Sequence, residues 1–147
     1  VRGIRLREND YVVGADILRE NSEVLVITEN GYGKRTEADQ YPVKGRGGKG
    51  IKTANITEKN GPLAGLAVVN GTEDVLLITN KGVIIRFSVT TVSTTGRATL
   101  GVRLMKMEDG AQIVTMAITE PEDDSENNTE EEASDVKASE TPEETEE

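Results

Sequence analysis

A cationic, glycine-rich stretch at residues 43–53, VKGRGGKGIKT, is the part of this sequence best suited to binding chemistry. Its glycines let the backbone approach a ligand closely, and its basic side chains supply positive charge with no acidic residue between them. The basic residues are Lys44, Arg46, Lys49 and Lys52, and the glycines are Gly45, Gly47, Gly48 and Gly50. This combination is suited to a polyanion.

Two nucleotide-binding motifs are similar to this stretch, and neither fits. Residues 45–50 have the spacing of G-x-G-x-x-G, but that fingerprint needs a helix after it, and the β-branched residues 51–57 show no helical periodicity. A G-x-x-x-x-G-K-[ST] phosphate loop fails on spacing, because Ile51 separates Gly50 from Lys52. We therefore expect no nucleotide site here and no cofactor in this chain.

Catalytic and metal-ligating patterns are not visible either. The chain contains no His and no Cys, and no nucleophile or metal-ligand constellation can be assembled from it. Tyr11, Tyr32 and Tyr41 match no catalytic motif and are interpreted as strand or loop residues. The chain itself is expected to be non-catalytic.

Charge divides the sequence into two parts. The formal net charge of -10 over 147 residues combines a mildly basic region, 1–119, with a strongly acidic one, 120–147. The first carries 16 Lys and Arg against 13 acidic residues, and the second carries one Lys against 14. Dense like charge and low hydrophobicity predict a disordered acidic tail over 120–147. This tail is expected to compete with other polyanions for the basic surface.

An internal repeat with a spacing of 51 residues organises the rest. Residues 24–31, VLVITENG, match residues 75–82, VLLITNKG, and several charged and glycine positions coincide further along. The basic pairs are Arg35 with Arg86, Arg46 with Arg97, and Lys52 with Arg103. We divide the chain into the end of one unit (1–20), a complete unit (21–71), a last unit (72–119) and the tail.

Turn signals divide each unit into about four short expected strands. Hairpins are expected at Asn30-Gly31 and Lys81-Gly82, and two short strands joined by a turn at residues 8–10 are expected in residues 1–20. Tandem four-stranded units of this length are typical of β-propeller blades. With 3% aromatic residues the core must be aliphatic, and its predicted members are Val24, Val26, Leu76, Ile78, Ile84, Val102, Ile113 and Ala117.

This repeat resembles the C-terminal domain of the bacterial DNA gyrase A subunit. Lys44-Gly45-Arg46-Gly47-Gly48-Lys49-Gly50 is similar to that family's box motif, Gln-Arg-Arg-Gly-Gly-Lys-Gly, at its last five positions. Lys44 and Gly45 depart from the first two, which favours a degenerate box of a later blade. The resemblance covers residues 1–119, and an acidic end is also typical of the family.

The resemblance implies an all-β fold, a partial ring of β-propeller (β-pinwheel) blades whose basic rim wraps double-stranded DNA. In the family this wrap lets the ATP-driven gyrase heterotetramer introduce negative supercoils. ATP, magnesium, the gyrase B subunit and a second A subunit are then bound through regions outside this chain. The candidate DNA-binding residues are Lys44, Arg46, Lys49, Lys52, Arg35, Arg86, Arg97 and Arg103. Contacts to phosphates alone predict binding that is nearly independent of base sequence.

Other interpretations stay open at this point. The blades could belong to a topoisomerase IV, or to a propeller used only for protein contacts. The chain opens on Val1-Arg2-Gly3 and is expected to be the C-terminal piece of a longer protein. It shows no membrane-span pattern and no signal-peptide pattern, so a cytoplasmic location is expected.

Overall fold

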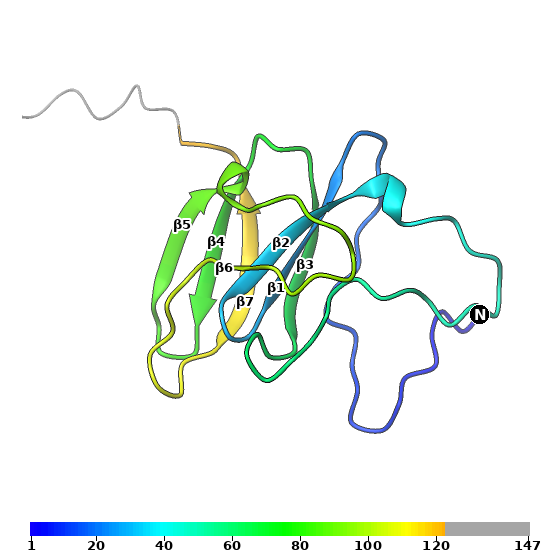
Figure 1. The fold of residues 1–147 in the computed structure, drawn as a ribbon, viewed down its shortest axis with the longest axis horizontal. Helices are drawn as coiled ribbons and strands as arrows, with labels where there is room; N and C mark the ends of the chain where they lie inside the picture. The colour runs from blue at the N-terminus through cyan, green and yellow to red at the C-terminus, as the bar shows by residue number, and fades with distance from the viewer. Residues whose placement is uncertain (123–147) are drawn as a thin grey trace, which may run out of the picture.

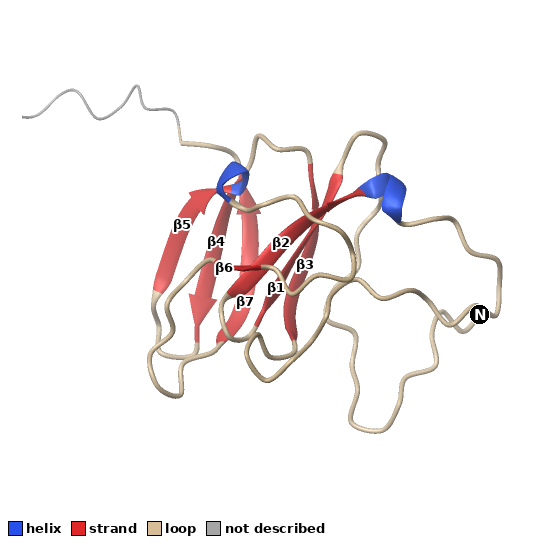
Figure 2. Ribbon diagram, in the orientation of Figure 1, coloured by secondary structure: helices blue, strands red, loops and turns tan. Residues whose placement is uncertain are grey.

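The computed structural model describes residues 1–122 and folds them into two antiparallel sheets with very little helix (Figures 1 and 2). The first sheet has the strand order β3-β1-β2-β6 and the second β5-β4-β7. The strands are β1 (Glu23–Thr28), β2 (Tyr32–Glu37), β3 (Leu63–Val69), β4 (Asp74–Thr79), β5 (Ile84–Ser88), β6 (Val102–Arg103) and β7 (Ile113–Thr119). Two single-turn 3₁₀ helices, η1 (Ala38–Gln40) and η2 (Val89–Thr91), follow β2 and β5. The predicted all-β fold is confirmed. Of the predicted disordered tail, 120–147, residues 123–147 lie outside the described part.

The internal repeat of the sequence is also a repeat of the backbone. Both predicted hairpins form, with the amide of Gly31 donating to the Thr28 carbonyl and that of Gly82 to the Thr79 carbonyl, each at 3.1 Å. Strand β1 pairs with β2 and β3, and β4 pairs with β5 and β7 in the same way. The pairing register shifts after Ile27 in one sheet and after Ile78 in the other. These two positions are again 51 residues apart.

The second repeat supplies the fourth strand of the first sheet. Strand β6 pairs with β2 through Tyr32↔Arg103 and Gly33↔Val102. Gly101 precedes β6 with a φ of 87°, and a Cβ there would lie 2.7 Å from the Gly33 carbonyl oxygen, so only glycine fits. Gly50, at the equivalent place, has a φ of 80°. Because one sheet draws on both repeats, the unit limits at 21–71 and 72–119 stay a prediction from the sequence.

The core lies where the two sheets pack face to face. Leu25 and Ile27 of β1 meet Val75 and Leu77 of β4, and all four side chains have no accessible surface. The remaining buried members are Ala67, Val69, Val89, Val92 and Ile113. Every core member is aliphatic, which confirms the composition argument.

Three of the eight predicted core residues are buried, and two of the others, Leu76 and Ile78, were expected on the wrong face of β4. Val24, Val26 and Ile113 are buried, but Ile84 is 59% exposed, Val102 is 37% exposed, and Ala117 is exposed. Side chains alternate between the two faces of a strand, so Val75 and Leu77 face the first sheet while Leu76 and Ile78 face away and are half-buried. The outer face of the second sheet is therefore apolar and uncovered by the described residues.

Residues 1–20 do not form the two predicted strands. The predicted turn exists, with Asn9 at a φ of 59° and the Asp10 amide donating to the Arg7 carbonyl at 3.2 Å. The segment then runs beside β3, where the Asp16 carboxylate accepts from the Val68 amide at 2.9 Å. This bond, followed by one from the amide of the next residue, lowers the pKa of Asp16. A side chain thus caps the open edge of β3, and segment 1–20 forms no backbone ladder with this edge.

Candidate nucleic-acid interface

The cationic loop, residues 43–53, lies on the side of the first sheet that faces away from the second sheet (Figure 1). Its basic side chains, Lys44, Arg46, Lys49 and Lys52, are all exposed. Gly47 and Gly50 hold positive φ values of 81° and 80°, which shape the loop without regular structure. Within residues 1–122, no carboxylate forms an ion pair with any of these four cations. Their charge is available to a ligand.

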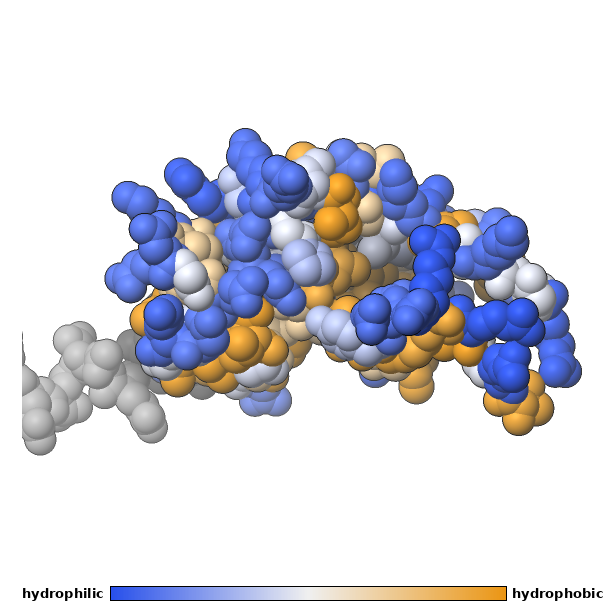
Figure 3. Space-filling view, turned by 90° about the horizontal axis from the view of Figure 1, so that it is seen from below, coloured by the Kyte–Doolittle hydropathy of each residue, from blue (hydrophilic) through white to orange (hydrophobic). Residues whose placement is uncertain are grey.

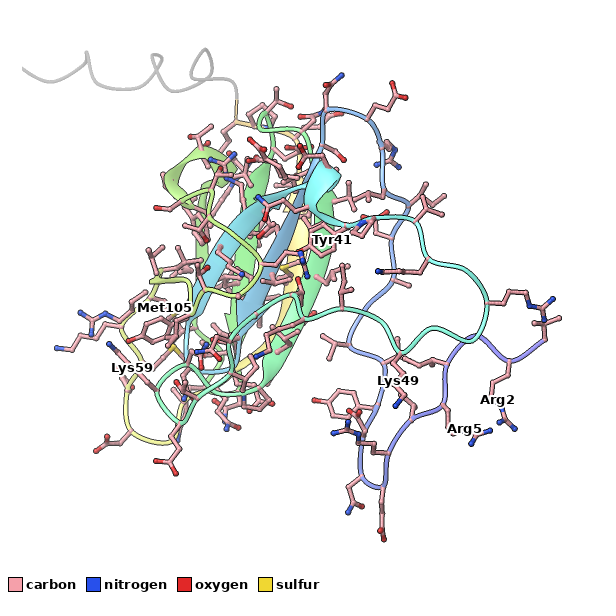
Figure 4. All side chains as sticks on the ribbon, turned by 45° about the vertical axis from the view of Figure 1, so that its right-hand side comes forward. Arg2, Arg5, Tyr41, Lys49, Lys59 and Met105 are labelled. Atoms are coloured by element: carbon pink, nitrogen blue, oxygen red, sulfur yellow. The ribbon has the colours of Figure 1, made fainter. Side chains whose placement is uncertain are left out.

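Two further cations lie beside this loop and were missed by the sequence analysis. Figure 4 shows Arg2 and Arg5 on the neighbouring N-terminal segment, close to Lys49, and both arginines are exposed. A signal for Arg5 existed, because the Gly3-Ile4-Arg5 triplet repeats Gly50-Ile51-Lys52. The cationic surface is therefore built from two separate segments of the chain.

Arg35 and Arg86 are engaged by acidic partners on their own sheets. Arg35 of β2 forms an ion pair with Glu23 of β1, and Arg86 of β5 forms one with Asp74 of β4 at 2.9 Å. Glu23 and Asp74 are themselves 51 residues apart, so each repeat carries the same cross-strand pair. The Arg35 guanidinium is further held by the Val92 carbonyl at 2.7 Å. These contacts give both arginines a structural role.

The start of the acidic segment lies against Arg86. The Glu122 carboxylate accepts from its Nη1 at 2.9 Å, and the Glu120 carbonyl accepts from its Nη2 at 3.0 Å. The Asp74 carboxylate accepts from the Nε of Arg86, so three acceptors surround one guanidinium. The positive charge of β5 is thereby largely neutralised within the described residues.

Arg97 joins the second repeat to the cationic loop. Its backbone lies in the turn at residues 96–99, and its Nη1 donates to the Lys52 carbonyl at 3.0 Å. One step further on, the Asn55 amide donates to the Thr99 carbonyl at 3.0 Å. The turn at 96–99 of the second repeat thus contacts residues 52–55 of the first, and the half-buried Arg97 lies next to Lys52.

Arg103 belongs to a different cationic region. It is exposed on β6 and lines an open cleft of about 600 Å³ together with Tyr32, Lys59 and Lys106. The Lys59 ammonium lies 5.8 Å from the centroid of the Tyr32 ring, within cation–π range. Glu108 and Asp109 line the same cleft. Figure 4 places Lys59 at the opposite end of the molecule from Lys49, so the two regions are separate.

Hydrophilic and apolar side chains are unevenly distributed over the surface. In the view from below, hydrophilic side chains crowd one edge of the molecule and apolar ones reach the surface along the other (Figure 3). Exposed apolar residues include Ile4, Val12 and Ile17 of the N-terminal segment and Ile84 of β5. In the part of the chain that the structure describes, no helix is long and apolar enough to cross a bilayer, and no group of three or more acidic side chains is placed to hold a metal ion.

Lys34 of β2 is buried although it carries an ammonium group. Its side chain is 1% exposed, and its Nζ donates to the Gly96 carbonyl at 2.7 Å, to the Arg97 carbonyl at 2.6 Å and to the Thr99 hydroxyl at 3.3 Å. Burial, followed by the nearby Arg97 charge, lowers the pKa of Lys34 from 10.5 to about 8. Within residues 1–122 no carboxylate pairs with it.

This lowered pKa predicts a stability that rises with pH between about 8 and 10.5. In that window the unfolded chain keeps the Lys34 proton while the folded chain has lost it, so the unfolded state binds more protons and is disfavoured as pH increases. Urea unfolding of the wild type and of Lys34→Met at pH 7, 8, 9 and 10 measures the difference. The difference in the free energy of unfolding between wild type and Lys34→Met should change between pH 8 and pH 10. A difference that is the same at every pH would contradict the lowered pKa of Lys34.

The C-terminal β-propeller domain of DNA gyrase is the family that matches this chain, over residues 1–19, 22–70 and 73–120, and the chain belongs to it. Curated relatives of the chain include DNA gyrase A subunits. The protein from Staphylococcus epidermidis strain ATCC 12228 is 55% identical over 126 residues, and that from Staphylococcus aureus strain NCTC 8325 is 50% identical over 135 residues. These matches cover 84% and 90% of the chain but only 14% and 15% of the relatives.

Solved structures show the same fold. A DNA gyrase A C-terminal domain superposes with a TM-score of 0.65 at 23% identity, covering 69% of this chain and 35% of that one. The C-terminal domain of DNA topoisomerase IV gives a TM-score of 0.64 at 23% identity, covering 73% and 32%. The β-propeller fold expected from the repeat is therefore confirmed. The structures alone do not separate gyrase from topoisomerase IV, whereas the family model and the two relatives named above are of gyrase.

Proposed function

We propose that this chain is the DNA-binding and DNA-wrapping part of a gyrase A protein. The observation that carries the proposal is the cationic loop, where Lys44, Arg46, Lys49 and Lys52 are exposed and no carboxylate of residues 1–122 pairs with them. Unpaired cations on a loop match the spaced phosphates of a duplex, which are bound by releasing condensed counterions. Arg2 and Arg5 extend this surface.

The candidate residues are expected to contribute unequally. The four cations of the loop come first, because nothing in residues 1–122 neutralises them. Arg97 comes next, because it is half-buried beside Lys52. Arg103 ranks below it, because it is exposed on β6 but lies in the separate cleft around Tyr32. Arg35 and Arg86 should contribute least, since both are already held by acidic partners. Phosphate contacts position a duplex without reading its bases, so little sequence preference is expected.

The wider role rests on the relatives. Their DNA gyrase A chains are about seven times longer than the matched region, so ATP-driven negative supercoiling is proposed for a whole protein of which this chain would be one part. The gyrase B subunit, a second A subunit, ATP and magnesium would then be bound elsewhere in a heterotetramer. A cytoplasmic location fits an enzyme that acts on bacterial DNA.

A salt titration tests the proposed binding. If about six phosphates are engaged, a plot of the logarithm of the association constant against the logarithm of salt concentration should have a slope of roughly -5. Fluorescence anisotropy of a labelled duplex with the 147-residue chain, from low to moderate salt, supplies the data. Two duplexes of unrelated sequence should give the same line within error.

A slope near zero, or no binding at low ionic strength, would overturn the proposal and favour a propeller used only for protein contacts. Wrapping is tested separately by relaxing a closed circular plasmid in the presence of the chain. A shift in linking number that grows with protein concentration supports wrapping. Binding without such a shift would leave a DNA-binding domain that does not wrap.

A further inference from the structure

A buried ammonium needs a reason, because removing a charge from water is costly unless every donor is satisfied. The three acceptors around Lys34 all lie in one turn, residues 96–99, which is 62 to 65 residues away along the chain. The lysine is therefore satisfied by a single segment of the other repeat. It also provides that segment with its anchor on β2.

The equivalent residue of the second repeat shows that the strand does not require lysine. Ile85 occupies the position 51 residues after Lys34, on β5, and is half-buried against the core. An aliphatic residue thus suffices for the strand at this position. Of the two equivalent positions, 34 and 85, the one that carries lysine is position 34, where the turn at 96–99 of the next repeat packs over the side chain.

The turn at 96–99 and its equivalent at 45–48 differ in the contacts that hold them in place. A Cβ built on Gly45 or Gly47 would have nothing within 4 Å, so the turn of the cationic loop stands free. The turn at 96–99, by contrast, has Lys34 beneath it and the Gln40 side chain beside it, with Gln40 accepting from the Arg97 amide at 3.4 Å. Thr99 closes the turn by donating its hydroxyl to the Gly96 carbonyl at 2.9 Å.

We propose that Lys34 is a positioning residue for DNA contact, which fixes the turn at 96–99 and thereby holds the Arg97 guanidinium against Lys52. Hydrogen bonds run from Lys34 to the backbone of Arg97, and from the Arg97 guanidinium to the Lys52 carbonyl at 3.0 Å. Lys34 itself is inaccessible and touches no ligand. Its role rests on the proposed function, since it sets the spacing between cations contributed by two repeats.

The first test does not involve DNA. Hydrogen exchange of the amides of residues 95–100 should be about tenfold faster in Lys34→Met than in the wild type, as expected when a buried anchor is lost. Lys81→Met removes the same charge from an exposed hairpin and should leave those amides unchanged. Unchanged exchange in a folded Lys34→Met protein would overturn the proposal, whether or not DNA binds.

The second test is a double-mutant cycle on duplex binding with Lys34→Met and Arg97→Ala. If Lys34 acts through Arg97, the double variant should bind no more weakly than Arg97→Ala alone, with a coupling of roughly fivefold or more in Kd. A purely structural lysine would give additive losses, and additivity would overturn the proposal. Absence of binding by the wild type would instead refute the proposed function and with it the DNA role of Lys34, while the exchange result would still show whether Lys34 anchors the turn.

A milder variant guards against misfolding. Thr99→Val keeps the shape of the side chain but removes one of the three acceptors of Lys34 and the bond that closes the turn. It should speed exchange in residues 95–100 by a smaller factor and couple with Arg97→Ala in the same direction. Exchange and DNA affinity equal to wild type would contradict the proposed role of the anchored turn.

Discussion

Replacing Leu77 with alanine is expected to lower the free energy of unfolding by about 2–5 kcal/mol, the range measured for large aliphatic residues truncated in a well-packed core. Leu77 has no accessible surface and lies in the layer between the two sheets with Leu25 and Ile27. Its truncation leaves a cavity that strands on both sides line. Urea unfolding followed by circular dichroism measures the loss.

Leu76→Ala is the matched control, because it removes the same atoms from the adjacent residue of the same strand. Leu76 faces away from the first sheet and is half-buried, so less apolar surface is returned to water and no enclosed cavity forms. Its effect should be less than half that of Leu77→Ala. Equal losses would mean that the outer face of the second sheet is covered in solution, for example by self-association, which a dependence on protein concentration would reveal.

The contrast between these two leucines shows where sequence reasoning reached its limit. The match between residues 24–31 and 75–82 correctly predicted two hairpins and the same pairing of the central strands β1 and β4 with their neighbours. It could not tell which alternate residues of β4 face the core, because the strand is apolar on both faces. In β1 both faces are buried, whereas in β4 only one is. Tertiary packing alone makes this distinction.

The sequence also did not predict that β6, from the second repeat, pairs with β2 of the first repeat. Only two residues, Val102 and Arg103, form this strand, and its pairing with β2 depends on backbone hydrogen bonds and on the close approach of Gly101 to Gly33. Such a contact leaves no hydrophobic period to detect. Residues 1–20 carry an equally strand-like pattern, yet the segment meets the open edge of β3 through the Asp16 side chain and forms no ladder with it.

Some features of the candidate site could be predicted from the sequence and others could not. Exposed cations on the cationic loop could be predicted, because a stretch rich in glycine and lysine with only two apolar residues, Val43 and Ile51, rarely forms a core. The ion pairs of Arg35 and Arg86 and the burial of Lys34 could not, since each depends on a partner 12 or more residues away. The segment YGKRTE of β2 has the composition of a solvent-exposed strand, and Lys34 is buried because the turn at 96–99 packs over it.

Replacing Arg46 and Lys49 together with alanine is expected to weaken DNA binding by roughly tenfold per lost contact at about 0.1 M salt, and to make the log–log salt slope shallower by roughly 2. Both side chains are exposed and pair with no carboxylate within residues 1–122, so the fold should be unaffected. Anisotropy titrations at four salt concentrations, with circular dichroism as a check on folding, measure the change. Arg97→Ala, which removes a half-buried cation, should cost less.

The matched control is Lys59→Ala with Lys106→Ala, which removes the same net charge from the cleft around Tyr32 at the other end of the molecule. If DNA follows the cationic loop, this control should change affinity only slightly, because screening confines the influence of an exposed charge to about 10 Å at 0.1 M salt. Equal losses for the two double variants would show that net charge alone attracts the duplex. A larger loss for the control would move the DNA path to the cleft, where Arg103 would become the principal contact in place of Arg46.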